Sequence, residues 1–454
     1  MVRSRLSMNN NFLYLNFINF TDVSLWDFKR YVAKKFASSY PIVKLGNYIQ
    51  EENTKVKPFD FPDKDFPILG VNNKTGLFDA YIEKGSNINQ PYKVVKDGFL
   101  AYNPYRVNVG SIGLKTAEQK YNYISPAYVV FSCRQGLLPE FLYILFRTNK
   151  FNIQIRESTT GSVRQTLSFS SMGNIEIPLP SIEKQKEIVE KYNSKIQKIV
   201  ELEFRISSLL QEKNNYMNEK LGIVSKVAKV TLNKLNFINY SDIKRWGISF
   251  ALKDKENSVS YSNDYKIKKI KEVCSIGSGG TPSRTNADYY NNGTIPWVKT
   301  TEVRNDIIRN TEEHITNDAI LNSSAKIYPT GSLIIAMYGQ GETRGRTAKL
   351  GIDAATNQAC CVLSDISAAL DTDYFWFYLM NEYARLRELA SGNNQPNLNA
   401  QMIASYPVII PPYDIQKEIV ETVTGINNQL SEARQNIERF KIEAQQQFEK
   451  ELFE

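Results

Sequence analysis

Histidine is almost absent from this sequence of 454 residues, in which His314 is the single example. Its scarcity removes the commonest general base and metal ligand from every other position. The cysteines, Cys133, Cys274, Cys360 and Cys361, form no Cys-x-x-Cys pair and have no neighbouring histidine. The sequence therefore predicts neither a zinc site nor a disulfide framework, and unpaired cysteines are typical of a reducing compartment.

The sequence also lacks the segments that take a protein to or across a membrane. No apolar run approaches the roughly 20 residues that a membrane-spanning helix needs. The first residues, Met1–Arg5, are followed by asparagines instead of the apolar stretch of a signal peptide. We therefore expect a soluble protein of the cytoplasm.

Motifs for catalysis are incomplete. No Gly-x-x-x-x-Gly-Lys-Ser/Thr loop occurs, which argues against an ATP-driven motor. Asn103–Tyr105 and Ile410–Tyr413 each match only part of the Asn-Pro-Pro-Tyr motif of adenine-N6 methyltransferases. No Gly-rich strand-to-helix turn followed by an acidic ribose ligand accompanies them. We predict no catalytic residue, no metal and no cofactor in this chain.

What the sequence does have is enough apolar material for more than one core. With 42% hydrophobic and 12% aromatic residues over 454 positions, the chain is expected to form two or more domains. Lysine plus arginine exceed aspartate plus glutamate by 56 to 48, which gives a formal net charge of +8. This balance suits a polyanionic partner without requiring one.

Two segments of the chain occur twice. Residues 15–26 (LNFINFTDVSLW) and 235–246 (LNFINYSDIKRW) are identical at seven of twelve positions, and residues 185–190 and 416–421 both read QKEIVE. The residues between these markers diverge. One unit is therefore duplicated in tandem, and its similar ends and different middles predict two modules that recognise different things.

Each unit closes with prolines followed by a long amphipathic stretch. The prolines of Ile175–Pro180 and Val408–Pro412 permit a helix only after them. Apolar residues then alternate three and four apart, which predicts a coiled-coil seam, interrupted in the first copy by Glu203 and Lys213. We expect helices of about 30 to 35 residues, roughly 45 to 50 Å long. An approximate two-fold between the units would set them antiparallel. The predicted seam residues are Val189, Tyr192, Ile196, Ile199, Ile206, Leu210, Ile419, Val423, Ile426, Leu430, Ile437 and Phe440.

The remaining residues predict the fold class. From about residue 40 to 180, and again from 265 to 411, short β-rich runs alternate with brief helices, which indicates α+β domains. The predicted organisation is a first globular domain with its lead-in (1–180), a first spacer helix (181–222), a second lead-in and globular domain (223–411) and a second spacer helix (412–454).

Polar loops of both modules carry side chains suited to nucleic acid. Arginine and amide side chains can bind guanine and adenine edges in the major groove, and glycine-rich turns with hydroxyl and basic neighbours can contact phosphates. Solvated loops and a tight structural turn are the simpler alternatives. The candidate contacts are Tyr102, Asn103, Tyr105, Arg106, Arg164 and Gln165 in the first module, and Thr281, Ser283, Arg284, Lys299, Tyr338, Gln340, Arg344, Arg346, Asn393, Asn394 and Gln395 in the second.

Together these segments resemble the specificity (S) subunits of Type I restriction-modification enzymes. The resemblance is carried by Gly279–Arg284 with Ile295–Trp297, by Gly331–Gly345, and by the proline segments that lead into Gln-Lys-Glu-Ile and the long helices. It covers nearly the whole chain. The first module departs from it, with Tyr48–Asn53 in place of the Gly-Gly-Thr-Pro opening.

The resemblance implies two target recognition domains, each reading one half of a bipartite sequence in double-stranded DNA, joined by antiparallel helices that set the gap. It also implies two methyltransferase subunits as partners and, in the full complex, two restriction subunits. S-adenosylmethionine, ATP and Mg would then be bound by these partners. Two alternatives remain open: a coiled-coil adaptor without DNA specificity, and a self-contained DNA methyltransferase.

Overall fold

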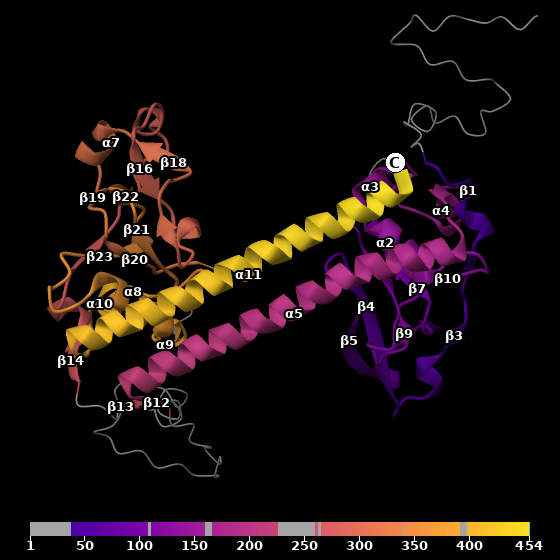
Figure 1. Cartoon of the computed structure of the whole chain (residues 1–454), viewed down its shortest axis with the longest axis horizontal. Helices are drawn as coiled ribbons and strands as arrows, with labels where there is room; N and C mark the ends of the chain where they lie inside the picture. Colours follow the sequence, from indigo (N-terminus) through magenta and orange to yellow (C-terminus); the bar gives the residue numbers. More distant parts are fainter. Residues whose placement is uncertain are drawn as a thin grey trace, which may run out of the picture. The chain divides into compact units, whose positions relative to one another are not determined.

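The computed structural model describes residues 38–107, 110–158, 166–225, 259–261, 265–339, 341–390 and 397–453. The chain divides into two compact units: unit 1 comprises residues 1–202 and 435–454, and unit 2 comprises 203–434. Each unit combines a globular part with one segment of each of two long helices, α5 (Ile182–Leu221) and α11 (Tyr413–Phe453) (Figure 1). The repeated segments around Trp26 and Trp246 lie outside the described residues.

In the described part of unit 1, a frame sheet has the strand order β2-β10-β7-β8 and a distal sheet has the order β3-β6-β9-β4-β5. Within the unit, the distal sheet lies on the side away from the α5 and α11 segments (Figure 1). Strands β1 and β11 form a separate antiparallel pair. The strands are β1 (Ile42–Lys44), β2 (Ile49–Glu51), β3 (Lys55–Val56), β4 (Asp65–Asn72), β5 (Gly76–Lys84), β6 (Tyr92–Val94), β7 (Leu100–Tyr102), β8 (Ile112–Leu114), β9 (Tyr123–Ile124), β10 (Val129–Cys133) and β11 (Glu176–Pro178), and the helices are α2 (Pro139–Phe146), α3 (Asn149–Ser158) and α4 (Phe169–Gly173).

The main core of unit 1 lies between its frame sheet and its helices. Helix α2 begins at Pro139, whose missing N–H costs nothing in a first turn. Its Phe141 is fully buried, and the ring centroid lies 5.7 Å from that of Phe448 on α11. Leu452 and Phe453 are buried in the same cluster. The end of α11 is therefore part of the core of unit 1.

Unit 2 repeats this plan among its described residues. Its frame sheet has the order β15-β23-β20-β21-β17, its distal sheet has the order β18-β16-β22-β19, and β14 pairs with β24 and β12 with β13. The strands are β12 (Ile223–Ser225), β13 (Val259–Tyr261), β14 (Lys266–Lys269), β15 (Ser275–Ser278), β16 (Ile295–Val298), β17 (Ile307–Ile308), β18 (Glu313–Ile315), β19 (Ile327–Tyr328), β20 (Leu333–Ala336), β21 (Thr347–Leu350), β22 (Ala354–Thr356), β23 (Cys360–Ser364) and β24 (Pro407–Ile410), and the helices are α7 (Asn317–Leu321), α8 (Thr372–Asn381), α9 (Tyr383–Glu388) and α10 (Ala400–Ala404).

The two frame sheets correspond strand for strand. The order β2-β10-β7-β8 of unit 1 matches β15-β23-β20-β21 of unit 2, with antiparallel pairing at every step. Gly98 and Gly331, ahead of β7 and β20, have φ angles of 81° and 89°, and their N–H groups donate to the carbonyls of Lys115 and Leu350 at 2.9 and 2.8 Å. The distal sheets also correspond: the order β6-β9-β4-β5 of unit 1 matches β19-β22-β16-β18 of unit 2, with the same pairing directions. They differ in the edge strand β3 that unit 1 adds, and in length, since β4 and β5 have 8 and 9 residues where β16 and β18 have 4 and 3. The structure thus confirms a duplicated α+β fold, in which the middles diverge in sequence and in the lengths of their strands but keep the same sheet plan.

The long helices pair antiparallel within each unit, as predicted. In unit 1, Lys191 and Lys195 at the beginning of α5 lie 2.6 and 2.8 Å from Glu451 and Glu443 near the end of α11. In unit 2, Lys220 at the end of α5 lies 2.5 Å from Glu418 at the beginning of α11. The helices have 40 and 41 residues, and so exceed the expected length.

The seam follows the predicted residues with one shift. Of the predicted residues of α11, Ile419, Val423, Ile426, Leu430 and Ile437 are buried and Phe440 is half-buried; on α5, Val189 and Ile199 are buried and Tyr192, Ile196 and Ile206 are half-buried. The predicted Leu210 is 36% exposed, whereas Leu209 is 1% exposed and packs with Ile426 and Leu430. Because the next seam position after Ile206 is three residues on, the helix buries Leu209 instead of Leu210.

The polar interruptions of the seam differ from each other. Glu203 is exposed, and half-buried Leu202 precedes it, so this expected interruption lies on the solvent side of the helix. Lys213 is half-buried, and its Nζ donates to Oδ1 of Asn427 at 3.3 Å. The expected interruption at Lys213 is therefore present and has a polar partner.

Candidate nucleic-acid interface

The loop between β20 and β21 carries predicted contact residues of unit 2. Tyr338 is 41% exposed, and Arg344 and Arg346 are half-buried. The guanidinium of Arg346 pairs with the carboxylate of Glu342 through Nη2. Gly345 has a φ of 85°, a conformation that other residues rarely adopt. The Arg346–Glu342 ion pair and the left-handed Gly345 therefore both favour this backbone conformation of the loop.

Two side chains of helix α9 bind backbone carbonyls of this loop. The hydroxyl of Tyr383 donates to the carbonyl of Glu342 at 2.6 Å, and Nη1 of Arg387 donates to the carbonyl of Arg344 at 3.1 Å. The same Nη1 donates to the Tyr383 hydroxyl at 2.8 Å. The sequence predictions did not include Tyr383 or Arg387. Their spacing of four residues on a helix, which places them on one face, is the signal that was available.

The glycine-rich turn before Arg284 is packed against other backbone. The Gly280 N–H donates to the carbonyl of Thr356 at 2.9 Å, and a Cβ added to Gly279 would lie 2.0 Å from that carbonyl oxygen. These glycines are therefore explained by a tight structural turn, and the Gly280 N–H is already used within the protein. Thr281 and Ser283 follow with exposed side chains.

A cluster of opposite charges lies on the distal sheet of unit 2. Nη1 of Arg284 is 2.6 Å from the carboxylate of Glu313, and Nζ of Lys299 is 2.9 Å from both Glu313 and Glu312. Hydrogen bonds from Arg284 and then Lys299 lower the pKa of Glu313. The Arg284 guanidinium also lies 4.3 Å from the ring centroid of Tyr290. Both predicted phosphate contacts are thus paired with acids, and a phosphate would have to replace these carboxylates.

In unit 1 the corresponding loop divides its predicted residues between core and surface. Tyr102 is fully buried and its hydroxyl donates to the carbonyl of Leu167 at 3.1 Å, so its side chain is a core group. Oδ1 of Asn103 accepts a hydrogen bond from the Tyr105 N–H at 3.0 Å. Tyr105 is 56% exposed and Arg106 is exposed. Tyr105 and Arg106 are therefore the residues of this loop that present side chains to solvent.

In each unit this loop is hydrogen-bonded to a leucine that follows the last predicted contact residues of the module, which are Gln165 in unit 1 and Gln395 in unit 2. The Leu167 N–H donates to the carbonyl of Pro104, and the Leu398 N–H donates to the carbonyl of Met337, both at 3.1 Å. Predicted residues that fall outside the described part of the chain are Arg164, Gln165, Gln340, Asn393, Asn394 and Gln395.

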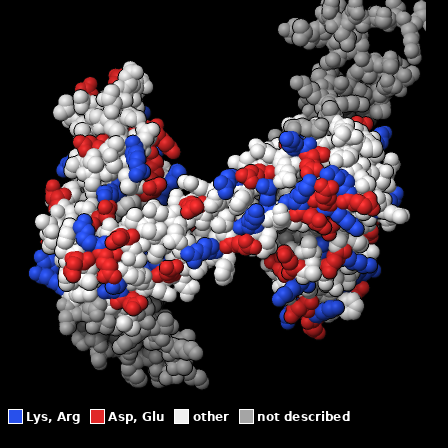
Figure 2. Space-filling view, viewed as in Figure 1, with Lys and Arg blue, Asp and Glu red and all other residues white. Residues whose placement is uncertain are grey.

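Acidic and basic side chains are intermixed over both units on the face shown in Figure 2. A row of lysines that the sequence predictions did not include lies in and after β14: Lys266, Lys269 and Lys271 are exposed, and Lys268 is half-buried. On this face any attraction of a polyanion therefore depends on particular residues, since no broad field of one sign is present.

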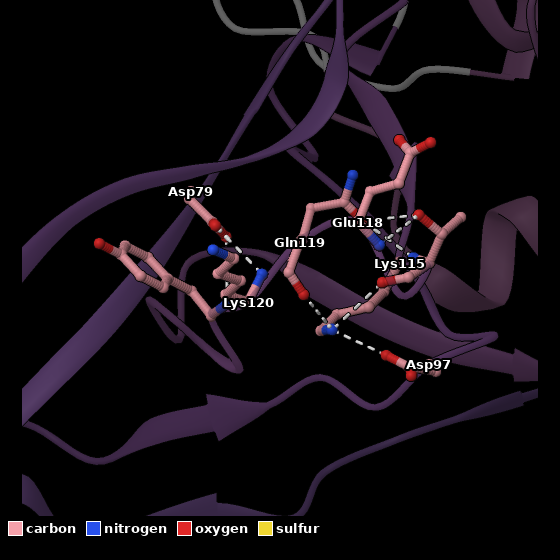
Figure 3. A network of polar contacts seen from close by, with 8 residues as sticks. Asp79, Asp97, Lys115, Glu118, Gln119 and Lys120 are labelled. Carbon is pink, nitrogen blue, oxygen red and sulfur yellow. Dashed lines mark hydrogen bonds and ion pairs between the residues drawn. The ribbon is translucent and has the colours of Figure 1, made fainter.

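Figure 3 shows a polar network that fixes the connection from β8 to β9 in unit 1. The Lys115 side chain is 3% exposed, and its Nζ lies 2.8 Å from Oδ1 of Asp97 and 3.0 Å from the carbonyl of Gln119. The carboxylate of Asp79 accepts the N–H groups of Lys120 and Tyr121, both at 3.0 Å. All of these groups are satisfied by one another, which indicates a structural role.

No group of three histidine, cysteine, aspartate or glutamate side chains suited to a metal ion occurs among the residues that the structure describes. In the same part of the chain, no helix is both long enough and apolar enough to cross a membrane.

Two units with the same plan of frame and distal sheets, each including a segment of both long helices, define a two-module protein. The chain belongs to the family described as Type I restriction modification DNA specificity domain, whose model matches residues 26–212 and 262–439. This confirms the family predicted from the sequence.

Relatives extend over most of the chain. It is 23% identical over 396 residues to the Type I restriction enzyme MjaIX specificity subunit of Methanocaldococcus jannaschii. The matched residues are 83% of this chain and 84% of the relative. It is 20% identical over 448 residues to the HindI specificity subunit of Haemophilus influenzae, which covers 88% and 92%. A solved chain from work on complex assembly and conformational transition of the type I R-M system has a TM-score of 0.55 at 16% identity and covers 92% of this chain and 98% of its own length. This last similarity supports the fold.

Proposed function

We propose that each unit of this chain binds one part of a two-part sequence in double-stranded DNA, and that the chain selects the site at which catalytic partner subunits act. The observation that carries this proposal is that one shared plan of sheets carries different outer parts: unit 1 adds strand β3 and a long β4–β5 hairpin, whereas unit 2 has the short strands β16 and β18 and adds helix α7. A protein that needed only two stable copies of a domain would have no reason to vary these parts. Two modules that read different bases would need these parts to differ.

In unit 2 the proposed base contacts are Tyr338, Arg344 and Arg346. A guanidinium presents its donors in a geometry suited to guanine O6 and N7, and Arg346 also forms an ion pair with Glu342 of the same loop. Arg284 and Lys299 are proposed phosphate contacts, together with Thr281 and Ser283. In unit 1 the corresponding proposed contacts are the exposed residues Tyr105 and Arg106, together with the half-buried Asn103.

The antiparallel helix segments support a further part of the proposal. Ion pairs between α5 and α11 in each unit favour a fixed helix pair that determines the number of base pairs between the two parts of the target. Two methyltransferase subunits, and in the full complex two restriction subunits, would bind this chain and supply the chemistry with S-adenosylmethionine, ATP and Mg. The chain itself is proposed to be non-catalytic.

The test is to express the full chain with its methyltransferase partner in a host that lacks both, and to map methylated bases across the genome. The expected result is a single two-part motif with a fixed gap, absent when the chain is omitted. Methylation without any two-part motif would refute the proposal. Methylation by the chain alone would favour the self-contained enzyme.

The adaptor alternative is distinguished by salt. Neutralised phosphates release counterions, so DNA affinity falls steeply with salt concentration. A DNA affinity of the purified complex that does not change between 50 and 200 mM salt would support a protein-binding adaptor.

A further inference from the structure

In both units a tyrosine and an arginine four residues apart on a helical segment hold the backbone of a polar loop. Nη1 of Arg147 donates to the hydroxyl of Tyr143 at 2.8 Å, and Nη1 of Arg387 donates to the hydroxyl of Tyr383 at the same distance. The guanidinium carbons lie 5.5 and 5.3 Å from the respective ring centroids. We refer to these two pairs as the tyrosine–arginine clamps.

The clamp of unit 1 holds the turn between β4 and β5. Nη2 of Arg147 donates to the carbonyl of Lys74 at 3.1 Å. Gly76 has a φ of 76°, and a Cβ added there would lie 2.6 Å from the Tyr143 hydroxyl. Two features therefore favour glycine at position 76: the left-handed backbone conformation and the close approach of the clamp, which leaves no room for a side chain.

The clamp of unit 2 contacts its loop in the same manner. It binds the carbonyls of Glu342 and Arg344. Gly345 has a φ of 85°, and a Cβ added there would lie 3.0 Å from Cγ of Arg387. The clamp thus binds one loop carbonyl in unit 1 and two in unit 2, and in both units it packs against a left-handed glycine of the loop that it holds.

The turn held in unit 1 is polar and adjoins the loop that presents Tyr105. Oδ1 of Asn72 accepts the N–H groups of Lys74 and Thr75 at 2.8 and 2.7 Å. The side chains of Asn73 and Lys74 are exposed. A Cβ added to Gly110, which ends that loop, would lie 3.8 Å from Cβ of Asn73. The turn thus places an amide and an ammonium group beside the loop.

The two clamps do not occupy equivalent positions of the repeat. The first begins in α2, which follows the strand β10, and the helix that follows the equivalent strand β23 is α8. The second lies on α9, the next helix along the chain. A feature required by the shared frame would recur at the same place. What the clamps have in common is the kind of loop that they hold.

We propose that the two tyrosine–arginine clamps are positioning elements for sequence readout, and that Asn73 and Lys74 contact the part of the DNA target read by unit 1. This rests on the function proposed above. The clamp side chains act through loop carbonyls, while Asn73 and Lys74 of the turn held in unit 1 have exposed side chains. Base discrimination requires side chains held to within about 0.5 Å, so freeing the loop would reduce discrimination more than overall affinity.

The experiment uses the full chain with its methyltransferase partner and maps methylated sites genome-wide. Arg147→Ala is expected to relax base preference in one part of the motif and Arg387→Ala in the other, each by roughly 5- to 150-fold at the affected positions, the range for one good base contact. Asn73→Ala and Lys74→Ala should relax the same part as Arg147→Ala. The matched controls are the exposed residues Arg134 and Arg309, whose replacement by alanine should leave the motif unchanged.

The part of the motif read by the other unit reports whether each variant folds and assembles. If a clamp variant relaxes both parts, or lowers methylation at an unchanged motif, the positioning role is overturned. If the alanine variants fail to accumulate, Tyr143→Phe and Tyr383→Phe decide, since they remove only a hydroxyl; an unchanged motif in both would overturn the proposal. A wild-type chain that yields no two-part motif would instead refute the proposed function itself.

Discussion

The side chains of Gln185 and Gln416 occupy the same position in the two units and make the same bonds. Oε1 of Gln185 accepts the N–H of Leu138 at 2.9 Å, and Oε1 of Gln416 accepts the N–H of Asp371 at 2.7 Å. Leu138 and Asp371 are the N-cap residues of α2 and α8. Each glutamine, one turn into a long helix, therefore caps a second helix of its globular part.

The amide nitrogens of these glutamines complete the correspondence. Nε2 of Gln185 donates to the carbonyls of Gly136 and Pro180, both at 2.9 Å. Nε2 of Gln416 donates to the carbonyls of Ala369 and Pro411 at 3.0 and 2.9 Å. Both side chains are at most 1% exposed. The identical QKEIVE segments of the sequence thus mark a hydrogen-bonded joint between each globular part and its helix.

Replacing Gln185 with alanine is expected to lower the free energy of unfolding by about 1 to 3 kcal/mol, because buried backbone groups would lose their partners. Gln185→Glu should cost more, since a carboxylate would face two carbonyl oxygens. Urea unfolding followed by circular dichroism measures both. Gln197→Ala, which removes an exposed amide on the same helix, is the control and should change stability by less than about 0.5 kcal/mol. Equal losses for Gln185→Ala and Gln197→Ala would contradict the joint.

Removing the charge of Glu313 is expected to strengthen non-specific DNA binding, because Arg284 and Lys299 would lose a shared carboxylate. Because Lys299 keeps its ion pair with Glu312, Arg284 is the cation released to reach a phosphate, and the slope of log affinity against log salt should steepen by about 1. Titration of a random-sequence duplex at several salt concentrations measures this for Glu313→Gln. Glu118→Gln, an exposed glutamate of unit 1, makes the same change in net charge. A similar effect of both variants would show that net charge alone is responsible.

Shortening both long helices by one heptad is expected to reduce the gap between the two parts of the target and leave the bases of each part unchanged. Deleting Lys195–Glu201 alone would shift α5 against α11, so residues 437–443 of α11, which include the partner of Lys195, are deleted with it. Each helix becomes about 10 Å shorter while the heptad register is kept. Methylome mapping reads the gap directly. An unchanged gap would show that the helices do not set it.

Lys213→Met is expected to raise the free energy of unfolding at neutral pH by on the order of 1 kcal/mol, because a partly buried charge is removed. Burial, and then the charge of Arg434, lower the pKa of Lys213. Between that lowered pKa and the ordinary lysine pKa of about 10.4, the unfolded chain binds more protons, so stability rises with pH in this window. Lys213→Met should lose this rise. Urea unfolding at pH 7 and pH 10 tests it, with exposed Lys441→Met as the control.

The repeat, the α+β class and the paired helices were predictable because each depends on local patterns. The prolines before Ile182 and Tyr413, where α5 and α11 begin, stop a strand and precede a helix. The spacing of Ile419, Val423 and Ile426 indicates a buried helical face. Positions where the spacing of three and four is ambiguous were not predictable, and there Leu209 is buried in place of Leu210.

The candidate interface was less predictable, because its geometry depends on contacts between distant residues. Tyr102 was predicted as a nucleic-acid contact, but its hydroxyl reaches Leu167, 65 positions away, in the core. The sequence also gave no indication that Arg284 and Lys299 share Glu313. Tyr383 and Arg387 act through the backbone of a loop some 40 residues earlier, and no local pattern indicates that partner.

The hydroxyl of Ser38 donates to the carbonyl of Leu452, 414 positions away, in the unit whose core also includes Phe448 and Phe453. During translation the globular part of unit 1 leaves the ribosome first, yet its core is completed by residues made near the end of synthesis. At 5 to 20 residues per second this interval lasts on the order of tens of seconds. Unit 2, whose residues 203–434 are contiguous, can finish folding within that time, so the unit that is begun first is expected to be completed last.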